Sequence, residues 1–165
     1  MTRSMSLNFD EFNSVVKIFD KQSSILQDQP YLWRKINDKY SSLSWKEVRN
    51  NVESFSAALK NLGILEGDRV VIVSENRPEW QIADLSIMAV GAISVPAYIT
   101  STTNDYEYII KHSGARCIIV SSHDLAKKIL PAVLNSNTCQ THFNSMSHTF
   151  QTHISKETLK HSEAF

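Results

Sequence analysis

The sequence predicts an α/β fold in which strands and helices alternate. Three observations lead to this prediction: a helix-capping motif followed by a regular apolar stripe, short runs of β-branched residues, and glycines where helices should end. Strands and helices that alternate with short links build a parallel sheet through right-handed crossovers. With 165 residues, the chain is long enough for one hydrophobic core or for part of a larger one.

The first 45 residues predict a helix and a small hairpin. Apolar residues recur at helical spacing within 9–27, namely Phe9, Phe12, Val15, Val16, Phe19 and Ile25 or Leu26. Pro30 should end this helix, because proline keeps the residue before it out of the helical conformation. The segment 31–45 then alternates loosely across an Asn-Asp-Lys turn, which is typical of a β-hairpin.

The clearest helix start lies at Ser44. In Ser-Trp-Lys-Glu, the Ser44 hydroxyl and the Glu47 carboxylate can each satisfy an amide that the first helical turn leaves unpaired. Gly63 offers the left-handed residue that closes such a helix. Between them an apolar stripe runs at alternating steps of four and three residues: Val48, Val52, Phe55, Leu59 and Leu62.

Two further strand-helix units are expected after Gly63. The run RVVIVS, residues 69–74, lacks polar alternation and is typical of a parallel strand covered on both faces. Pro78 suits the first turn of the next helix, where its missing amide hydrogen costs nothing, and Gly91 should end that helix.

The pattern then repeats. Residues 92–98 predict a strand, and 104–113 a helix that starts with a second capping box at Asn104 and Glu107 and ends at Gly114. A strand over 115–121 and a helix from 123 up to Pro131 complete the series.

Composition changes after Leu134. From residue 132 to the end, the charged residues are Lys156, Glu157, Lys160 and Glu163, while Ser, Thr, Asn, Gln and His dominate. Since no helix or strand period is sustained, we expect a polar tail that does not join the core. The predicted organisation is therefore a helical segment 1–30, an α/β domain 31–134 and a disordered or frameshifted tail 135–165.

Charge and composition restrict the classes of function. Seventeen basic and seventeen acidic residues give no net field to attract nucleic acid. No segment has the apolar run of a signal peptide or approaches the roughly 18 apolar residues of a membrane span. Cys117 and Cys139 form no CxxC pair and no disulfide framework. We expect a cytoplasmic chain, with peripheral membrane association and self-association left open.

The corner SENRPEW, residues 74–80, has the outline of a phosphate site between a strand and a helix. It contains none of the glycines that a dinucleotide fold or a P-loop needs there. Glu75 and Glu79 would repel a phosphate, leaving Arg77 as the one attractive charge. We therefore favour a solvated turn capped by Ser74 or Asn76.

Three weaker candidates also have plain structural interpretations. We interpret the hydroxyl-rich loop 99–105 as helix capping rather than an anion site, because it lacks glycine and lysine. Asp84 is interpreted as the polar edge of an apolar helix, next to Gln81. Four residue types that zinc accepts, Cys139, His142, His148 and His153, have a spacing that matches no zinc module we know. We assign no catalytic, cofactor-binding or metal residue.

Five blocks in order resemble the start of an AMP-forming acyl-CoA synthetase of the adenylate-forming ligase family: LSWKEV, AALKNLGILEGDRV, SENRPEW, AVGAISVPAY and YIIKHSGAR. The resemblance covers about Tyr31 to Leu134, which makes the 31–134 segment a partial AMP-binding domain. The form VPAYITST, with Tyr98 where short-chain members more often carry asparagine, resembles the long-chain fatty acid branch.

The resemblance implies a two-step reaction. A carboxylate attacks ATP to give acyl-AMP and pyrophosphate, with Mg²⁺ offsetting phosphate charge, and coenzyme A then displaces AMP. The family's Ser/Thr/Gly-rich loop ending in Pro-Lys-Gly, and its later motifs, have no counterpart here. We therefore expect an N-terminal fragment that is inactive alone and holds no cofactor, whereas the full-length enzyme uses fatty acid, ATP, Mg²⁺ and CoA. The alternative is a non-catalytic α/β interaction module derived from such a ligase.

Overall fold

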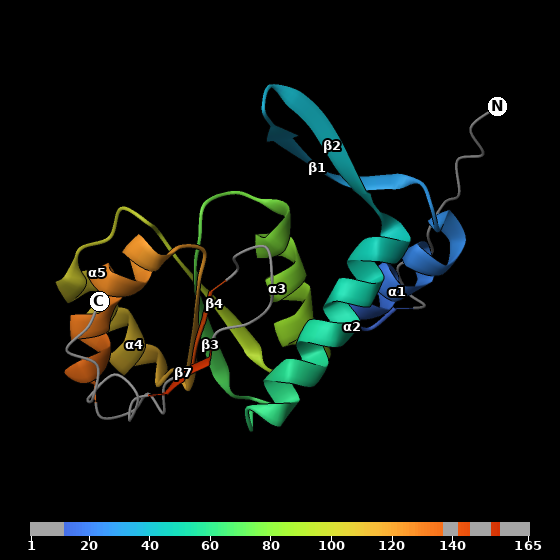
Figure 1. The fold of residues 1–165 in the computed structure, drawn as a ribbon. Coiled ribbons are helices and arrows are strands. Elements are labelled where there is room, and N and C mark those ends of the chain that lie inside the picture. The colour runs from blue at the N-terminus through green and yellow to red at the C-terminus, as the bar shows by residue number, and fades with distance from the viewer. Residues whose placement is uncertain (1–11, 137–141, 146–152, 156–165) are drawn as a thin grey trace. The chain divides into compact units, whose positions relative to one another are not determined.

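A computed structural model describes residues 12–136, 142–145 and 153–155 of the chain (Figure 1). The chain divides into two compact units, residues 1–50 and 51–165, which we describe separately. The three-part division at residues 30 and 134 stays a prediction.

The first unit contains a helix and an antiparallel hairpin. Helix α1 (Val15–Leu26) begins at Ser14, whose hydroxyl accepts a hydrogen bond from the Lys17 amide at 3.3 Å. Strands β1 (Pro30–Ile36) and β2 (Lys39–Ser44) pair antiparallel. Asn37 and Asp38 both have positive φ, 48° and 62°, as a two-residue hairpin turn requires. The expected hairpin is confirmed. The expected helix over 9–27 is confirmed for Val15–Leu26, but Phe12 lies before the helix start, and Phe9 lies outside the described residues.

The prediction that Pro30 ends α1 is wrong. The helix ends at Leu26, where Gln27 adopts a φ of 42° and donates its amide to the Ser23 carbonyl. Pro30 instead opens β1, a strand position where its missing amide hydrogen is tolerated.

Aromatic side chains pack the first unit together. The rings of Tyr31 and Trp45 stack with centroids 3.7 Å apart, and the Phe19 ring lies 6.0 Å from each of them. These contacts bury the ring faces against one another, and burying large aromatic rings stabilises the unit. Helix α1 is thereby tied to the hairpin.

Helix α2 (Trp45–Asn61) starts and ends where the sequence predicts. The Ser44 amide donates to Glu47 Oε2 at 2.7 Å, and the Glu47 amide donates back to the Ser44 hydroxyl at 3.2 Å. Gly63 has a φ of 77°, and the Ile64 amide reaches the Leu59 carbonyl at 3.1 Å. This is the Schellman closure of a helix.

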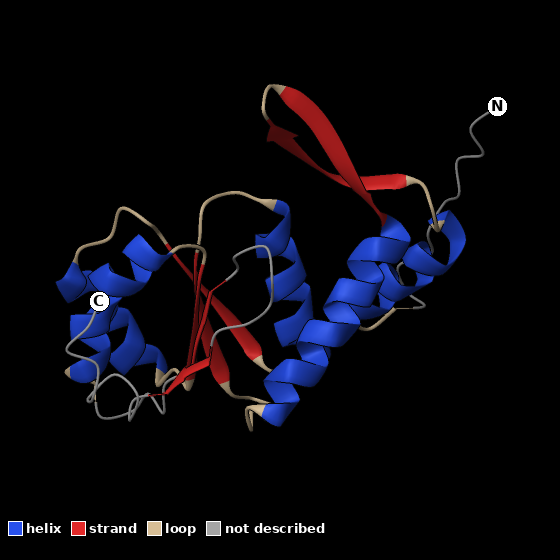
Figure 2. Cartoon of the chain, viewed as in Figure 1, coloured by secondary structure: helices blue, strands red, loops and turns tan. Residues whose placement is uncertain are grey.

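The second unit is built on a mostly parallel sheet. Its strands are β3 (Arg69–Val73), β4 (Ile93–Ala97), β5 (Cys117–Val120), β6 (His142–Ser145) and β7 (His153–Ser155), in the order β4-β3-β5-β6-β7. All neighbours pair in parallel except β6 and β7. Helices α3 (Pro78–Ala89), α4 (Thr103–Ser113) and α5 (His123–Leu134) connect them (Figure 2).

Helices cover both faces of this sheet, as Figure 1 shows for α3 and α4. Successive residues of β3 and β5 alternate between two buried clusters, which confirms the prediction from RVVIVS. One cluster joins Val70, Ile72, Cys117 and Ile119 to Phe55 and Leu59 of α2 and to Ala83 and Ile87 of α3. The other joins Val71, Val73, Ile118 and Val120 to Tyr106 and Ile110 of α4 and to Leu125 and Ile129 of α5.

Two predicted helix boundaries are wrong. The capping box of α4 is formed by Thr102 and Asp105, not by Asn104 and Glu107, because the helix begins earlier and Asn104 already lies in its first turn. Helix α5 continues through Pro131 to Leu134. The fully buried Ala132 and Val133 explain this continuation, since their packing offsets the one backbone hydrogen bond that proline removes.

The prediction that the tail forms no strand is also wrong for the described part of it. Residues 142–145 pair in parallel with β5, and 153–155 pair with 142–145. Strand pairing uses backbone amides and carbonyls, which are the same in polar and apolar segments, so composition alone could not exclude it.

Candidate functional site

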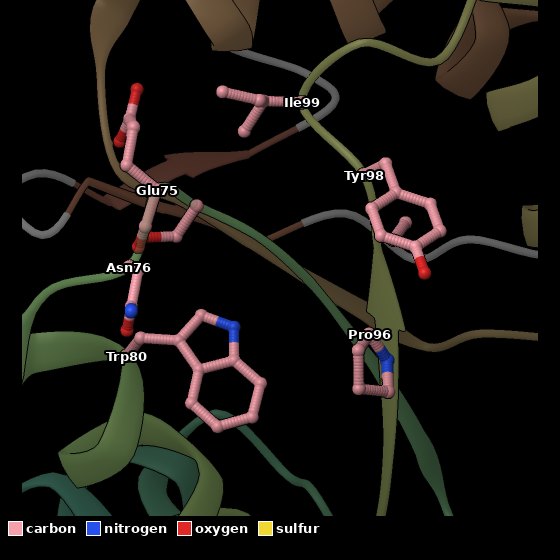
Figure 3. Close-up of a pocket in the computed structure, with 8 residues that line it drawn as sticks. Glu75, Asn76, Trp80, Pro96, Tyr98 and Ile99 are labelled. Carbon is pink, nitrogen blue, oxygen red and sulfur yellow. The ribbon is translucent and has the colours of Figure 1, made fainter.

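A pocket of about 460 Å³ opens at the carboxyl ends of β3 and β4 (Figure 3). Two strand-to-helix connections line it: residues 74–77, which we call the first connection, and residues 98–102, the second connection. The lining side chains are Ser74, Glu75, Asn76, Trp80, Pro96, Ala97, Tyr98 and Ile99. Ligands of open α/β sheets bind at this edge, outside the carboxyl ends of the strands.

The first connection runs from β3 into α3. Its N-cap is Arg77, in extended conformation at φ −151° and ψ 158°, and Pro78 follows as the first helical residue. No side chain among the described residues caps α3, so the prediction of capping by Ser74 or Asn76 is wrong. The reason is Pro78, which excludes the helical conformation at Arg77 and so moves the helix start beyond both predicted caps.

Long-range polar contacts hold the first connection instead. The Ser121 hydroxyl, which follows β5, donates to Glu75 Oε2, and Arg77 Nη1 approaches the Ser121 carbonyl at 3.5 Å. Arg77 Nε also pairs with Glu79 Oε2 at 2.9 Å. The Ser121 hydroxyl is the main cause that holds the pKa of Glu75 below its usual value.

The second connection is held by α4 and α5. The buried Tyr106 donates its hydroxyl to the Tyr98 carbonyl at 2.7 Å, and Lys128 Nζ donates to the Ile99 carbonyl at 3.0 Å. At its end, the Thr102 amide donates to Asp105 Oδ2 at 2.7 Å and the Asp105 amide returns to the Thr102 hydroxyl at 3.3 Å. This capping box confirms that the hydroxyl-rich loop serves to start the helix.

The chemistry of the pocket is apolar with an acidic rim. Figure 3 shows the Trp80 indole on the side of the first connection and Pro96 and Tyr98 across from it. Glu75 is the one charged side chain among the described residues that line the pocket. A glutamate is ionised at neutral pH, and the Ser121 hydroxyl lowers the pKa of Glu75 further, so the rim repels phosphate. The geometry suits a flat or apolar group against Trp80 and Pro96.

The structure brings only some of the candidate residues from the sequence to the pocket. Glu75 and Asn76 line the pocket, whereas Arg77 is engaged with Glu79 beside it. Sequence reasoning missed Trp80 and Pro96. The signal that could have found them is the place of both residues next to the carboxyl ends of two adjacent parallel strands.

The remaining candidates lie elsewhere. Asp84 is half-buried on α3, as its interpretation as a polar edge requires. Cys139 and His148 lie outside the described residues. His142 and His153 lie on β6 and β7, opposite Ser155 and Asn144. Within the described part of the chain, no group of three or more His, Cys, Asp or Glu residues could hold a metal ion.

Among the residues that the structure describes, none of the helices combines the length and the apolar character needed to cross a bilayer.

A mostly parallel sheet with helices on both faces and a pocket at its carboxyl edge defines the class: an α/β domain with a pocket at the edge where such sheets place their ligands. The family is given by a match over residues 19–163 to the family model described as AMP-binding enzyme. This chain belongs to the AMP-binding enzyme family, as the five sequence blocks predicted. The matched range is wider at both ends than the range Tyr31 to Leu134 expected from those blocks.

The curated relatives are mostly long-chain enzymes. The chain is 38% identical over 82 residues to long-chain-fatty-acid–CoA ligase FadD15 of Mycobacterium tuberculosis, which covers 50% of this chain and 14% of that protein. It is 30% identical over 108 residues to fatty acyl-CoA synthetase A of Dictyostelium discoideum. This alignment covers 66% of this chain and 16% of that protein. The chain thus spans about one-sixth or less of the length of these two relatives.

Solved structures agree on the fold. A benzoate CoA ligase from Burkholderia xenovorans matches with a TM-score of 0.67 and 25% identity, over 79% of this chain and 25% of that one. The anthranilate CoA ligase AuaEII, solved with anthranoyl-AMP, matches with a TM-score of 0.75 and 21% identity. The match covers 88% of this chain and 28% of that one. The second likeness is one of fold alone.

Proposed function

We propose that this chain supplies the N-terminal α/β layer of a long-chain fatty acid–CoA ligase and does not adenylate fatty acids by itself. Such a ligase converts ATP, a fatty acid and CoA into acyl-CoA, AMP and pyrophosphate. We further propose that the isolated chain does not hold ATP or Mg²⁺ tightly.

The observation that carries the proposal is the charge of the pocket. Adenylation requires groups that stabilise negative charge on the α-phosphate as it develops. The pocket offers the opposite, since the Glu75 carboxylate is negatively charged at neutral pH and its hydrogen bond from the Ser121 hydroxyl stabilises that charge. The nearby cation, Arg77, is occupied by Glu79 and the Ser121 carbonyl. The ligands of the phosphates would therefore come from parts of a ligase that these described residues do not include.

The test is pyrophosphate release by the purified chain with ATP, Mg²⁺ and a panel of saturated fatty acids of increasing length. We expect no turnover above the rate without protein, and no saturable heat of ATP binding by calorimetry. A full-length relative, such as the FadD15 ligase, serves as the positive control. Clear turnover by the chain alone would contradict the proposal.

A second candidate function is a non-catalytic interaction module. The observation that favours it is the pair of hydrophobic clusters on the two faces of the sheet, each closed by two helices. Such a unit can fold independently. A cooperative melt of the soluble chain, together with absence of turnover, would favour the module. An aggregated product without a melting transition would favour the inactive fragment.

A further inference from the structure

The β1–β2 hairpin exposes aromatic side chains that no cluster of its own unit covers. Trp33 is 57% exposed and Tyr40 is 73% exposed. The strand register pairs Trp33 with Ser42 and Lys35 with Tyr40. Because directly paired residues share a face of the hairpin, Trp33, Lys35 and Tyr40 lie together on one face.

The charge of the hairpin differs from that of the whole chain. Residues 30–44 contain three basic side chains, Arg34, Lys35 and Lys39, and one acidic side chain, Asp38, although the full chain is neutral. Lys35 Nζ pairs with Asp38 at 2.7 Å, but both side chains are largely exposed. Exposed pairs of this kind are weak, so an external anion can compete for the lysine.

Ile36, 41% exposed, and Lys39 are paired with each other beside the turn. This pair lies on the opposite face from Trp33, Lys35 and Tyr40, but next to the turn it is only one residue away from Lys35 and Tyr40 along each strand. Tryptophan and tyrosine favour the interface of a bilayer, where the ring is buried among the headgroups and its polar tip stays wet. Lysines near the surface are attracted to anionic lipids over about a Debye length.

We propose that the β1–β2 hairpin is a membrane-docking surface that inserts Trp33 and Tyr40 into the headgroup region of a bilayer containing anionic lipids. Lys35, on the same face as the rings, and Lys39, beside the turn on the other face, supply the longer-range attraction to the lipid charge. The aromatic rings supply the apolar contact. This proposal concerns the location of the protein and not its catalysis, so membrane docking is expected whether or not the chain adenylates fatty acids. It would place the protein at the surface into which long-chain fatty acids partition.

A nucleic acid is the rival partner for an aromatic and basic surface, because bases stack on exposed rings. The hairpin carries a net charge of only +2 and no extended basic stripe, which favours a lipid surface over a polyanion. Titration of a labelled oligonucleotide with the unmodified chain and with Trp33→Ala separates the two.

The experiment is flotation of the full chain with vesicles of phosphatidylcholine alone or of phosphatidylcholine mixed with phosphatidylserine. We expect binding to the mixed vesicles that weakens as salt is raised, and little binding to the neutral ones. Trp33→Ala should lower the partition coefficient about tenfold, the loss expected when one partly buried aromatic side chain is removed. Lys39→Gln should lower it about fivefold on the mixed vesicles.

Matched control variants lie in the second unit. Tyr108→Ala removes another exposed aromatic ring, 65% exposed on α4, and Lys127→Gln removes an exposed lysine of α5. Both should bind vesicles as the unmodified chain does. Since Trp33 is exposed, its removal should leave the thermal melt unchanged, which separates lost docking from lost folding.

Tryptophan fluorescence gives a second measurement. Of the three tryptophans, Trp33 is exposed while Trp45 and Trp80 are half-buried. Mixed vesicles should shift the emission to shorter wavelength, and Trp33→Ala should abolish this shift. The proposal is overturned if the unmodified chain does not float or if Trp33→Ala floats equally well. It is also overturned if Trp33 serves another partner: an oligonucleotide that Trp33→Ala no longer binds, or a second copy of the chain, shown by a dimer without lipid that Trp33→Ala dissociates.

Discussion

The two connections that line the pocket are held in different ways. The first connection, residues 74–77, depends on Ser121, which is 46 residues away from Glu75 in the sequence. The second connection, residues 98–102, is held by a capping box within four residues and by Tyr106, eight residues from Tyr98. One longer-range contact, from Lys128 to the Ile99 carbonyl 29 residues away, adds to these. The pocket therefore has one wall fixed by distant contacts and one fixed mainly by local ones, and substitutions should separate the two.

The largest effect is expected at Tyr106, which anchors the second connection. Its side chain is 1% exposed within the cluster of α4 and α5, and its hydroxyl bonds the Tyr98 carbonyl. Tyr106→Ala should lower the free energy of unfolding by about 3 to 5 kcal/mol, the usual cost of removing a buried aromatic ring. Urea denaturation followed by circular dichroism measures this.

Tyr106→Phe is the matched control, because it keeps the ring and removes only the hydrogen bond. It should cost about 1 kcal/mol. If the phenylalanine variant were as unstable as the alanine variant, the hydroxyl bond to Tyr98 and not the packing would fix the second connection.

The same contrast explains which features could be predicted from sequence. Helix α2 was predicted from Ser44, Glu47 and Gly63 because each acts on backbone within a few residues. The buried strands followed from their apolar runs. The bridge from Glu75 to Ser121 could not be found, because sequence spacing does not reveal which residues follow adjacent strands until the strand order β4-β3-β5 is known.

Two local errors have the same origin. At Pro131, buried contacts of Ala132 and Val133 outweighed a local helix breaker. In the tail, backbone pairing with β5 outweighed a polar composition. In each case, tertiary packing overrode a preference that the sequence expresses only locally. The pocket itself was missed for this reason, since its lining comes from two connections that the sheet brings together.

An intermediate effect is expected at Ser121, which anchors the first connection. Ser121→Ala removes the hydroxyl that donates to the Glu75 carboxylate. Hydrogen bonds to charged groups are strong, but Glu75 is exposed to solvent, so the free energy of unfolding should fall by only about 1 kcal/mol. Ser74→Ala is the matched control in the same connection, because the Ser74 hydroxyl makes only a local bond to the Glu75 carbonyl. It should cost less. Equal costs would mean that the distant bridge does not hold this wall.

Acidification should reduce the effect of Ser121→Ala. The Ser121 hydroxyl lowers the pKa of Glu75 in the folded chain, so the bridge stabilises fully above the unfolded pKa of about 4.3. This stabilisation is lost as the pH falls through the lower pKa of the folded state. The difference in unfolding free energy between Ser121→Ala and the unmodified chain should therefore be constant from pH 6 to 8, an interval well above both pKa values, and shrink below about pH 4. A difference that grows on acidification would mean that Glu75 is not the partner that matters.

The smallest effect is expected at Thr102, the N-cap of α4. Thr102→Ala removes the acceptor of the Asp105 amide, and because the box is exposed the cost should be near the low end for N-caps, about 0.5 kcal/mol. Thr100→Ala, a neighbouring exposed threonine in the same connection, is the matched control and should change nothing measurable. Amide hydrogen exchange resolves so small a change: exchange in the first turn of α4 should quicken in Thr102→Ala while the second turn, anchored by Tyr106, stays protected. If exchange quickened throughout residues 98–102 instead, the Thr102 cap and not Tyr106 would hold the second connection. That wall of the pocket would then be fixed by a contact between residues only three positions apart.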